Sequence, residues 1–163
     1  MDAVSPEPAH TYLQLRSRIL SLDPTKLGLS PSIQAPHVWG VVMETGYTVG
    51  TATMVSLVDG TTSLYYSTGG GMLGSGEYTP VAEASKAFVA QAENLLQYMS
   101  SSDEFPLPQV GQVRFVLMTY TGMLTAPEIE KTLASGNHPL SHLYRLGHET
   151  LTQLHLLAEK NRK

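Results

Sequence analysis

Apolar residues recur with a helical period near the N-terminus of the chain. Between residues 11 and 22 they are spaced three or four positions apart, while Arg16 and Arg18 fall outside the apolar stripe. The stripe consists of Tyr12, Leu15, Ile19 and Leu22. This spacing predicts an amphipathic helix that turns both arginines toward solvent and ends before Asp23-Pro24.

After residue 36 the pattern changes to segments rich in β-branched and aromatic side chains. Three strands are expected at about 37–45, 51–58 and 61–68, and a fourth at 113–120. Asp59-Gly60 separates the second strand from the third, and this dipeptide is typical of two-residue hairpin turns because both positions tolerate positive φ. The first three strands are therefore expected to form an antiparallel meander.

The expected sheet carries very little charge. Between Leu27 and Gly76, the only charged side chains are Glu44 and Asp59, whereas a sheet with one solvated face alternates apolar residues with polar or charged ones. We expect both faces of the sheet to be covered, by helices or by a second subunit. The alternative is that serine and threonine hydroxyls line one solvated face.

Two longer helices are expected after the meander. Thr79 is a candidate N-cap and Pro80 suits the first helical position, and the apolar stripe that follows continues to Met99. A second helix is expected at 139–160, with a broad leucine-rich face. Leu156 projects outside that face, which predicts a contact beyond the domain.

Thr125-Ala-Pro-Glu128 matches a capping box and predicts a short helix that runs to about Ala134 and stops at Gly136. The fold class expected is α+β, with one antiparallel sheet of four to five strands and helices on both faces. Residues 10–163 would form a single domain after a disordered tail at residues 1–9. This order of elements loosely resembles the architecture of roadblock, longin and profilin-like regulatory domains, without a shared sequence motif.

Composition excludes several classes of function. The net charge is −4 and the ten lysines and arginines are spread out, which argues against nucleic-acid binding because phosphate contacts need a clustered basic face. The chain has no cysteine, so disulfides and thiolate metal sites are excluded. The N-terminus does not resemble a signal peptide, and no apolar run is long enough to cross a membrane. We expect a soluble cytoplasmic protein without a cofactor.

Residues 65–80, YYSTGGGMLGSGEYTP, hold five glycines within eight positions. Gly69-x-Gly71-x-x-Gly74 formally matches the dinucleotide-binding fingerprint, but the preceding strand closes an antiparallel meander instead of a parallel βαβ unit. Backbone amides of a turn before a helix can still bind an anion. The candidate ligand-binding residues are Gly69, Gly70, Gly71, Gly74, Ser75 and Thr79. A structural turn or a mobile lid is the preferred interpretation, and Met72, Leu73 and Leu156 are candidate contacts with a partner protein.

The histidines do not form a recognisable metal site. His148-Glu149 begins a zinc-protease pattern that lacks its second histidine, and His155 lies about 10 Å further along the same helix. His138 and His142 have better spacing, although His138 precedes a proline and is expected outside the helix. We assign no metal ligand.

No pattern of catalytic residues is present either. Glu44 stands in an otherwise uncharged strand, near its end, and is expected to be exposed to solvent. The alternative is a buried functional acid with a raised pKa, for which Arg114 is a candidate partner across the sheet. We assign no catalytic residue.

The preferred functional hypothesis is a non-catalytic interaction or regulatory domain that binds a partner protein or a second copy of itself as a homodimer. The alternative is a protein, with or without enzymatic activity, that binds a small molecule or anion in a pocket at the Gly69–Gly76 loop. Stability that depends on protein concentration would favour the first hypothesis, and stability that depends on ligand would favour the second.

Overall fold

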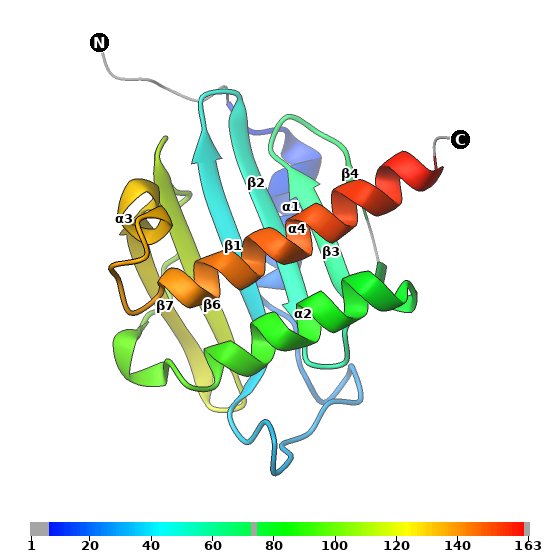
Figure 1. Cartoon of the computed structure of the whole chain (residues 1–163), viewed down its shortest axis with the longest axis vertical. Coiled ribbons are helices and arrows are strands. Elements are labelled where there is room, and N and C mark those ends of the chain that lie inside the picture. Colours follow the sequence, from blue (N-terminus) through cyan, green and yellow to red (C-terminus); the bar gives the residue numbers. More distant parts are fainter. Residues whose placement is uncertain (1–6, 73–74, 162–163) are drawn as a thin grey trace.

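Seven antiparallel strands form one sheet in the computed structural model of the chain, which describes residues 7–72 and 75–161 (Figure 1). The strands follow the order β4-β3-β2-β1-β6-β7-β5 across the sheet. In chain order the elements are α1 (His10–Ile19), β1 (Val38–Tyr47), β2 (Gly50–Leu57), β3 (Thr62–Tyr66), β4 (Gly71–Met72), η1 (Ser75–Glu77), α2 (Thr79–Ala92), η2 (Leu96–Tyr98), β5 (Ser100–Ser101), β6 (Gln112–Thr119), β7 (Gly122–Ile129), α3 (Glu130–Ala134) and α4 (Ser141–Asn161). The α+β class and the antiparallel sheet are as predicted.

Helices α2 and α4 lie side by side across one face of the sheet (Figure 1). Their apolar stripes bury Phe88 and Leu154 against strand residues such as Met43, which are all nearly inaccessible to solvent. Gly147 allows this close approach, because a Cβ at that position would come within 2.5 Å of the Met43 sulfur. This face therefore holds the larger hydrophobic core of the domain.

The opposite face of the sheet carries α1 and the chain segment that follows it (Figure 1). Ile19 of α1 packs with the buried strand residues Trp39, Val42 and Val55 in a second apolar cluster. Helices of the same chain thus lie on both faces of the charge-poor sheet, as predicted, although α1 leaves part of the second face, toward β3, uncovered.

Two predictions about the strands of the sheet were wrong. The sheet has seven strands in the described chain instead of four to five, so the resemblance to roadblock, longin and profilin-like domains is only loose. The segment from Gly122 to Ile129 is strand β7, because it pairs with β6 over eight residue pairs, and helix α3 starts only at Glu130. The local capping-box pattern was outweighed by this long-range pairing.

Helix α2 also differs from its predicted boundaries. It begins at Thr79 itself, follows Tyr78 without a side-chain cap, and ends at Ala92 instead of continuing to Met99. Met99 is buried nonetheless and, like Leu95 before it, belongs to the larger core. Among the residues that the structure describes, no helix is long and apolar enough to cross a membrane.

Candidate ligand-binding site

Helix α1 is fixed to the sheet by a buried ion pair. Arg16 donates from Nε to Glu44 Oε2 at 2.7 Å and from a terminal nitrogen to Glu44 Oε1 at 2.8 Å, in a bidentate arrangement. The Glu44 side chain is only 1% exposed and that of Arg16 only 13%. Two predictions were therefore wrong: Arg16 does not face solvent, and Glu44 is not exposed. The helical period alone did not reveal that a carboxylate on the sheet lies beneath Arg16.

Two hydroxyl groups, one on the sheet and one on α1, extend the hydrogen-bond network of this ion pair. Thr53, opposite Glu44 on β2, donates to Glu44 Oε2 at 2.8 Å, and the Tyr12 hydroxyl lies 2.6 Å from Thr53 Oγ1. Burial, and then the charge of Glu44, raises the pKa of Tyr12 to about 12. For Arg16, burial alone would lower the pKa, but the hydrogen bonds and charge of Glu44 raise it overall. At neutral pH the Tyr12 hydroxyl is therefore protonated and neutral, and Arg16 carries its positive charge.

A second arginine connects this network to the loop before β6. Arg114 lies opposite Glu44 on β6, as expected, but its hydrogen bonds go to the Pro106 carbonyl and to Thr125 Oγ1. Arg16 also donates to the Phe105 carbonyl. Burial lowers the pKa of Arg114, and the charge of Glu44 partly opposes this effect. Two guanidinium groups thereby hold residues 105–106 over this face of the sheet.

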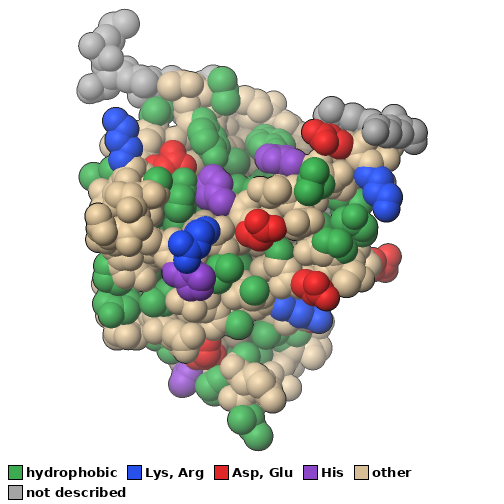
Figure 2. All heavy atoms as spheres, in the orientation of Figure 1, with side chains coloured by type: hydrophobic (Ala, Val, Ile, Leu, Met, Phe, Trp, Pro, Cys, Tyr) green, Lys and Arg blue, Asp and Glu red, His purple; other side chains and the backbone are tan. Residues whose placement is uncertain are grey.

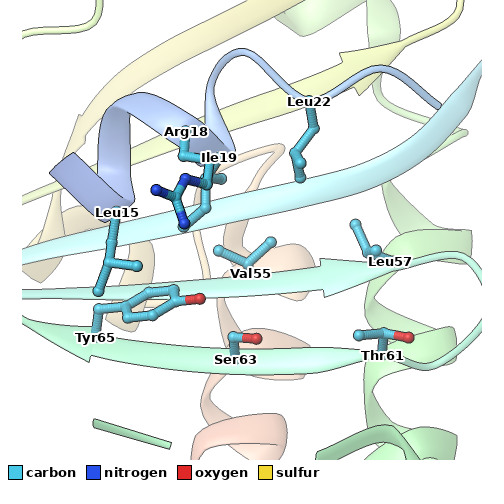
Figure 3. A pocket seen from close by; sticks show the side chains of 9 residues that line it. All are labelled: Leu15, Arg18, Ile19, Leu22, Val55, Leu57, Thr61, Ser63 and Tyr65. Atoms are coloured by element: carbon cyan, nitrogen blue, oxygen red, sulfur yellow. The ribbon is translucent and has the colours of Figure 1, made fainter. Parts of the chain in front are cut away.

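A pocket of about 330 Å³ opens beside α1, above strands β2 and β3 (Figure 3). The face of α1 that packs on the sheet carries Tyr12, Arg16 and Ile19. Beside this face, Leu15, Arg18 and Leu22 border the pocket. The complete lining is Leu15, Arg18, Ile19 and Leu22 from α1 and the turn after it, with Val55, Leu57, Thr61, Ser63 and Tyr65 from the strands and their connection. The pocket is therefore built from two segments that are about 40 residues apart in the sequence.

The floor of this pocket is apolar, and its border combines leucines with polar side chains and Arg18. Val55 is 5% exposed, while Ile19 and Leu57 are each 7% exposed. Arg18 is the one charged residue in the lining. It forms no ion pair with any residue in 7–72 or 75–161, in contrast to Arg16 two positions earlier. The site can thus offer an apolar surface together with a single positive charge.

The structure separates the predicted glycine-rich ligand site into two parts. Gly69 and Gly70 form the β3–β4 hairpin turn, where φ values of 109° and 81° favour glycine, and the Gly70 carbonyl accepts from the Tyr66 amide. Gly71 and Met72 form β4 and pair back onto β3. A Cβ on Gly76 would come within 2.8 Å of Thr61, at the other end of β3. Because β3 has five residues, about 15 Å separates the two groups of glycines.

The remaining candidates of this stretch are placed as follows. Ser75 begins η1 and Thr79 begins α2, while Leu73 and Gly74 lie outside the described residues. Met72 is half-buried against the main core, whereas Leu156 on α4 is 50% exposed, outside the apolar face as predicted. A ligand or partner role for each of them stays a prediction.

The four histidines considered as metal ligands, His138, His142, His148 and His155, lie near α3 or on α4, and three of them contact an acidic or phenolic group. On the face that carries α4, histidine side chains are scattered and do not gather in one cluster (Figure 2). His138 Nε2 lies 3.1 Å from Glu128 Oε2, and the Tyr66 hydroxyl lies 3.3 Å from His155 Nε2. Burial lowers the pKa of His148, although the charge of Glu130 opposes this change. In the described ranges, no group of three or more histidine, aspartate or glutamate side chains is arranged to hold a metal ion.

Sequence reasoning did not find the pocket. The signal that was present is a pattern on the third strand, where Thr61, Ser63 and Tyr65 alternate with the buried Thr62 and Leu64. This alternation marks a sheet face that is less deeply covered than its neighbours. It does not reveal which segment borders the uncovered area.

Comparison of the chain with protein-family models, with curated proteins and with solved structures found no match in any of the three searches.

Proposed function

We propose that this protein is a non-catalytic regulatory domain that binds a small, largely apolar molecule in the pocket between α1 and strands β2 and β3. The observation that supports the proposal is the pocket itself, with a volume of about 330 Å³ and a floor of buried aliphatic side chains. Ligand sites typically have volumes of about 300–1,000 Å³, are mostly apolar, and carry a few polar groups that orient the ligand. The cytoplasmic location expected from the sequence remains part of this proposal.

The volume limits the size of the occupant. One molecule of liquid water takes up about 30 Å³, so the pocket corresponds to roughly eleven water molecules. A compact molecule with about ten non-hydrogen atoms is a suitable occupant. The helix or strand of a partner protein is too large to enter, although it could contact the rim.

The lining favours binding over catalysis. None of the nine lining residues is a histidine, an acid, a lysine or a cysteine, so the pocket offers neither a general base nor a strong nucleophile. A bound molecule would meet an apolar floor and hydrogen-bonding groups at the border.

Binding of a partner protein or homodimer formation stays a second prediction. Its support is the exposed Leu156 on α4, but single exposed apolar residues are normal on the surfaces of monomers. The pocket therefore carries the proposal. Light scattering over a range of protein concentrations tests the second prediction independently of any ligand.

The proposed function is tested with 1-octanol, a neutral probe with nine non-hydrogen atoms. In titrations followed by ¹H–¹⁵N correlation spectra, we expect saturable shifts confined to residues 15–22 and 55–65. The variant Val55→Phe, which places a ring in the pocket, should abolish them. Shifts spread over the whole sheet, or unchanged by Val55→Phe in a folded variant, would contradict the proposal.

A further inference from the structure

We infer that the ligand of this pocket is a small apolar carboxylate whose carboxyl group is bound by Arg18. The inference rests on the proposed function, since it names the chemical class of the molecule that the pocket takes. Figure 3 shows the Arg18 guanidinium directed from α1 toward the strands, between Leu15 and Val55. An arginine in this position can offer two parallel N–H groups to a carboxylate.

The two arginines of α1 have opposite electrostatic surroundings. Arg16 is neutralised by the buried Glu44 through two hydrogen bonds. Arg18 has no acidic residue beside it in the pocket lining and forms no ion pair within the described part of the chain. Its positive charge favours an anion over a cation in the same space. A ligand carboxylate would give Arg18 the partner that Arg16 already has.

The arrangement of side chains also indicates how the molecule would lie. In Figure 3, Leu15, Arg18 and Tyr65 are at one end of the pocket, and Leu22 and Leu57 are at the other. Val55 forms the floor between the two ends. We therefore place the carboxylate beside Arg18, near Tyr65, and the apolar body along Val55 toward Leu22 and Leu57.

The charge of the lining favours a carboxylate over a phosphate. Arg18 supplies one positive charge and no lysine, second arginine or histidine lines the pocket. A phosphate monoester carries between one and two negative charges at neutral pH and has three strong acceptor oxygens. One guanidinium balances a monoanion, so a carboxylate matches the pocket better than a phosphate does.

The test compares octanoate with 1-octanol, which share an eight-carbon chain and differ in the charged end. Calorimetric titrations of the wild type at neutral pH and low salt should give at least about tenfold tighter binding of octanoate. Arg18→Gln should weaken octanoate binding about tenfold more than it weakens 1-octanol binding. Lys26→Gln is the matched control, because it removes one positive charge from an exposed residue outside the pocket lining and should change neither affinity.

The outcomes separate this inference from the proposed function. Equal affinities of the wild type for octanoate and 1-octanol would overturn the carboxylate assignment and leave the apolar pocket standing. Equal losses of octanoate affinity in Arg18→Gln and Lys26→Gln would also overturn it, since they would reflect net charge alone. If neither probe shifts the amide signals of residues 15–22 and 55–65, the proposed function itself fails.

Discussion

The buried ion pair beneath α1 allows a quantitative test of the structure. Arg16→Met keeps much of the apolar stem but removes the guanidinium, which donates two hydrogen bonds to Glu44 and one to the Phe105 carbonyl. Removing one partner of a buried ion pair costs about 3–5 kcal/mol, because the other charge stays buried without compensation. Glu44 would keep the Thr53 hydroxyl, and Arg114 lies on the adjacent strand. We therefore expect a loss near the lower limit, about 3 kcal/mol.

Arg18→Met is the matched control for this substitution. It makes the same chemical change two residues later on the same helix, at an exposed position without an ion pair to any described residue. Surface substitutions of this kind change stability by less than about 0.5 kcal/mol. The difference between the two variants therefore isolates the buried ion pair from net charge and from helix propensity.

Urea unfolding followed by Trp39 fluorescence measures these changes, because this sole tryptophan is only 2% exposed in the folded chain. A double variant, Arg16→Met with Glu44→Met, adds a second comparison. Apolar side chains can replace a buried ion pair with little loss of stability, so we expect the double variant to be more stable than Arg16→Met alone. The reasoning is refuted if Arg16→Met lies within about 1 kcal/mol of Arg18→Met.

Three further predictions concern other parts of the fold. Gly46→Ala should destabilise by about 2–3 kcal/mol because its Cβ would come within 2.1 Å of a backbone carbonyl in the loop before β6. Gly147→Ala should cost only about 1 kcal/mol in the same urea assay, because its closest contacts are with the flexible end of Met43, and the Phe88 ring is 3.1 Å away. Leu154→Ala should lower the free energy of unfolding by about 3 kcal/mol because Leu154 is fully buried, whereas Leu156→Ala at a half-exposed site should lower it by less than about 0.5 kcal/mol. Equal losses of stability in the two variants would show that α4 packs differently. Burial lowers the pKa of His148 below 6.5, so at this residue the unfolded chain takes up a proton more readily than the folded chain. The contribution of His148 to the free energy of unfolding should therefore be complete above about pH 7 and decrease as the pH falls. His148→Gln should reduce this loss below about pH 7, and equal pH profiles in thermal unfolding would argue against a partly buried imidazole.

The parts of the fold that were predicted correctly depend on local pattern. The strands β1, β2, β3 and β6 were found because β-branched and aromatic residues dominate them and Asp59-Gly60 marks the turn. Strand β7 was missed because Thr125-x-x-Glu128 suits both a capping box and a strand. Only its pairing with β6, which is a long-range interaction, decides between the two.

The placement of charges shows a related limit. Glu44 was recognised as unusual in a charge-poor strand, and Arg114 was correctly placed on the strand beside it. The ion pair is nevertheless made by Arg16, which lies 28 positions earlier in the chain. A helical wheel assigns Arg16 to the polar side, but it cannot show that this side meets a buried carboxylate. A search for the cations able to reach Glu44 from every expected element would have included Arg16.

The pocket could not be predicted, because it depends on how much of the sheet each helix covers. Adjacent strands are about 4.8 Å apart, so a seven-stranded sheet is about 29 Å wide. At about 1.5 Å per residue, the 21 residues of α4 extend about 32 Å, whereas the ten residues of α1 extend only about 15 Å. Helix α4 therefore spans its face and α1 cannot span the other. The ion pair with Glu44 fixes α1 over β1 and β2, and the area beside it toward β3 remains open as the pocket.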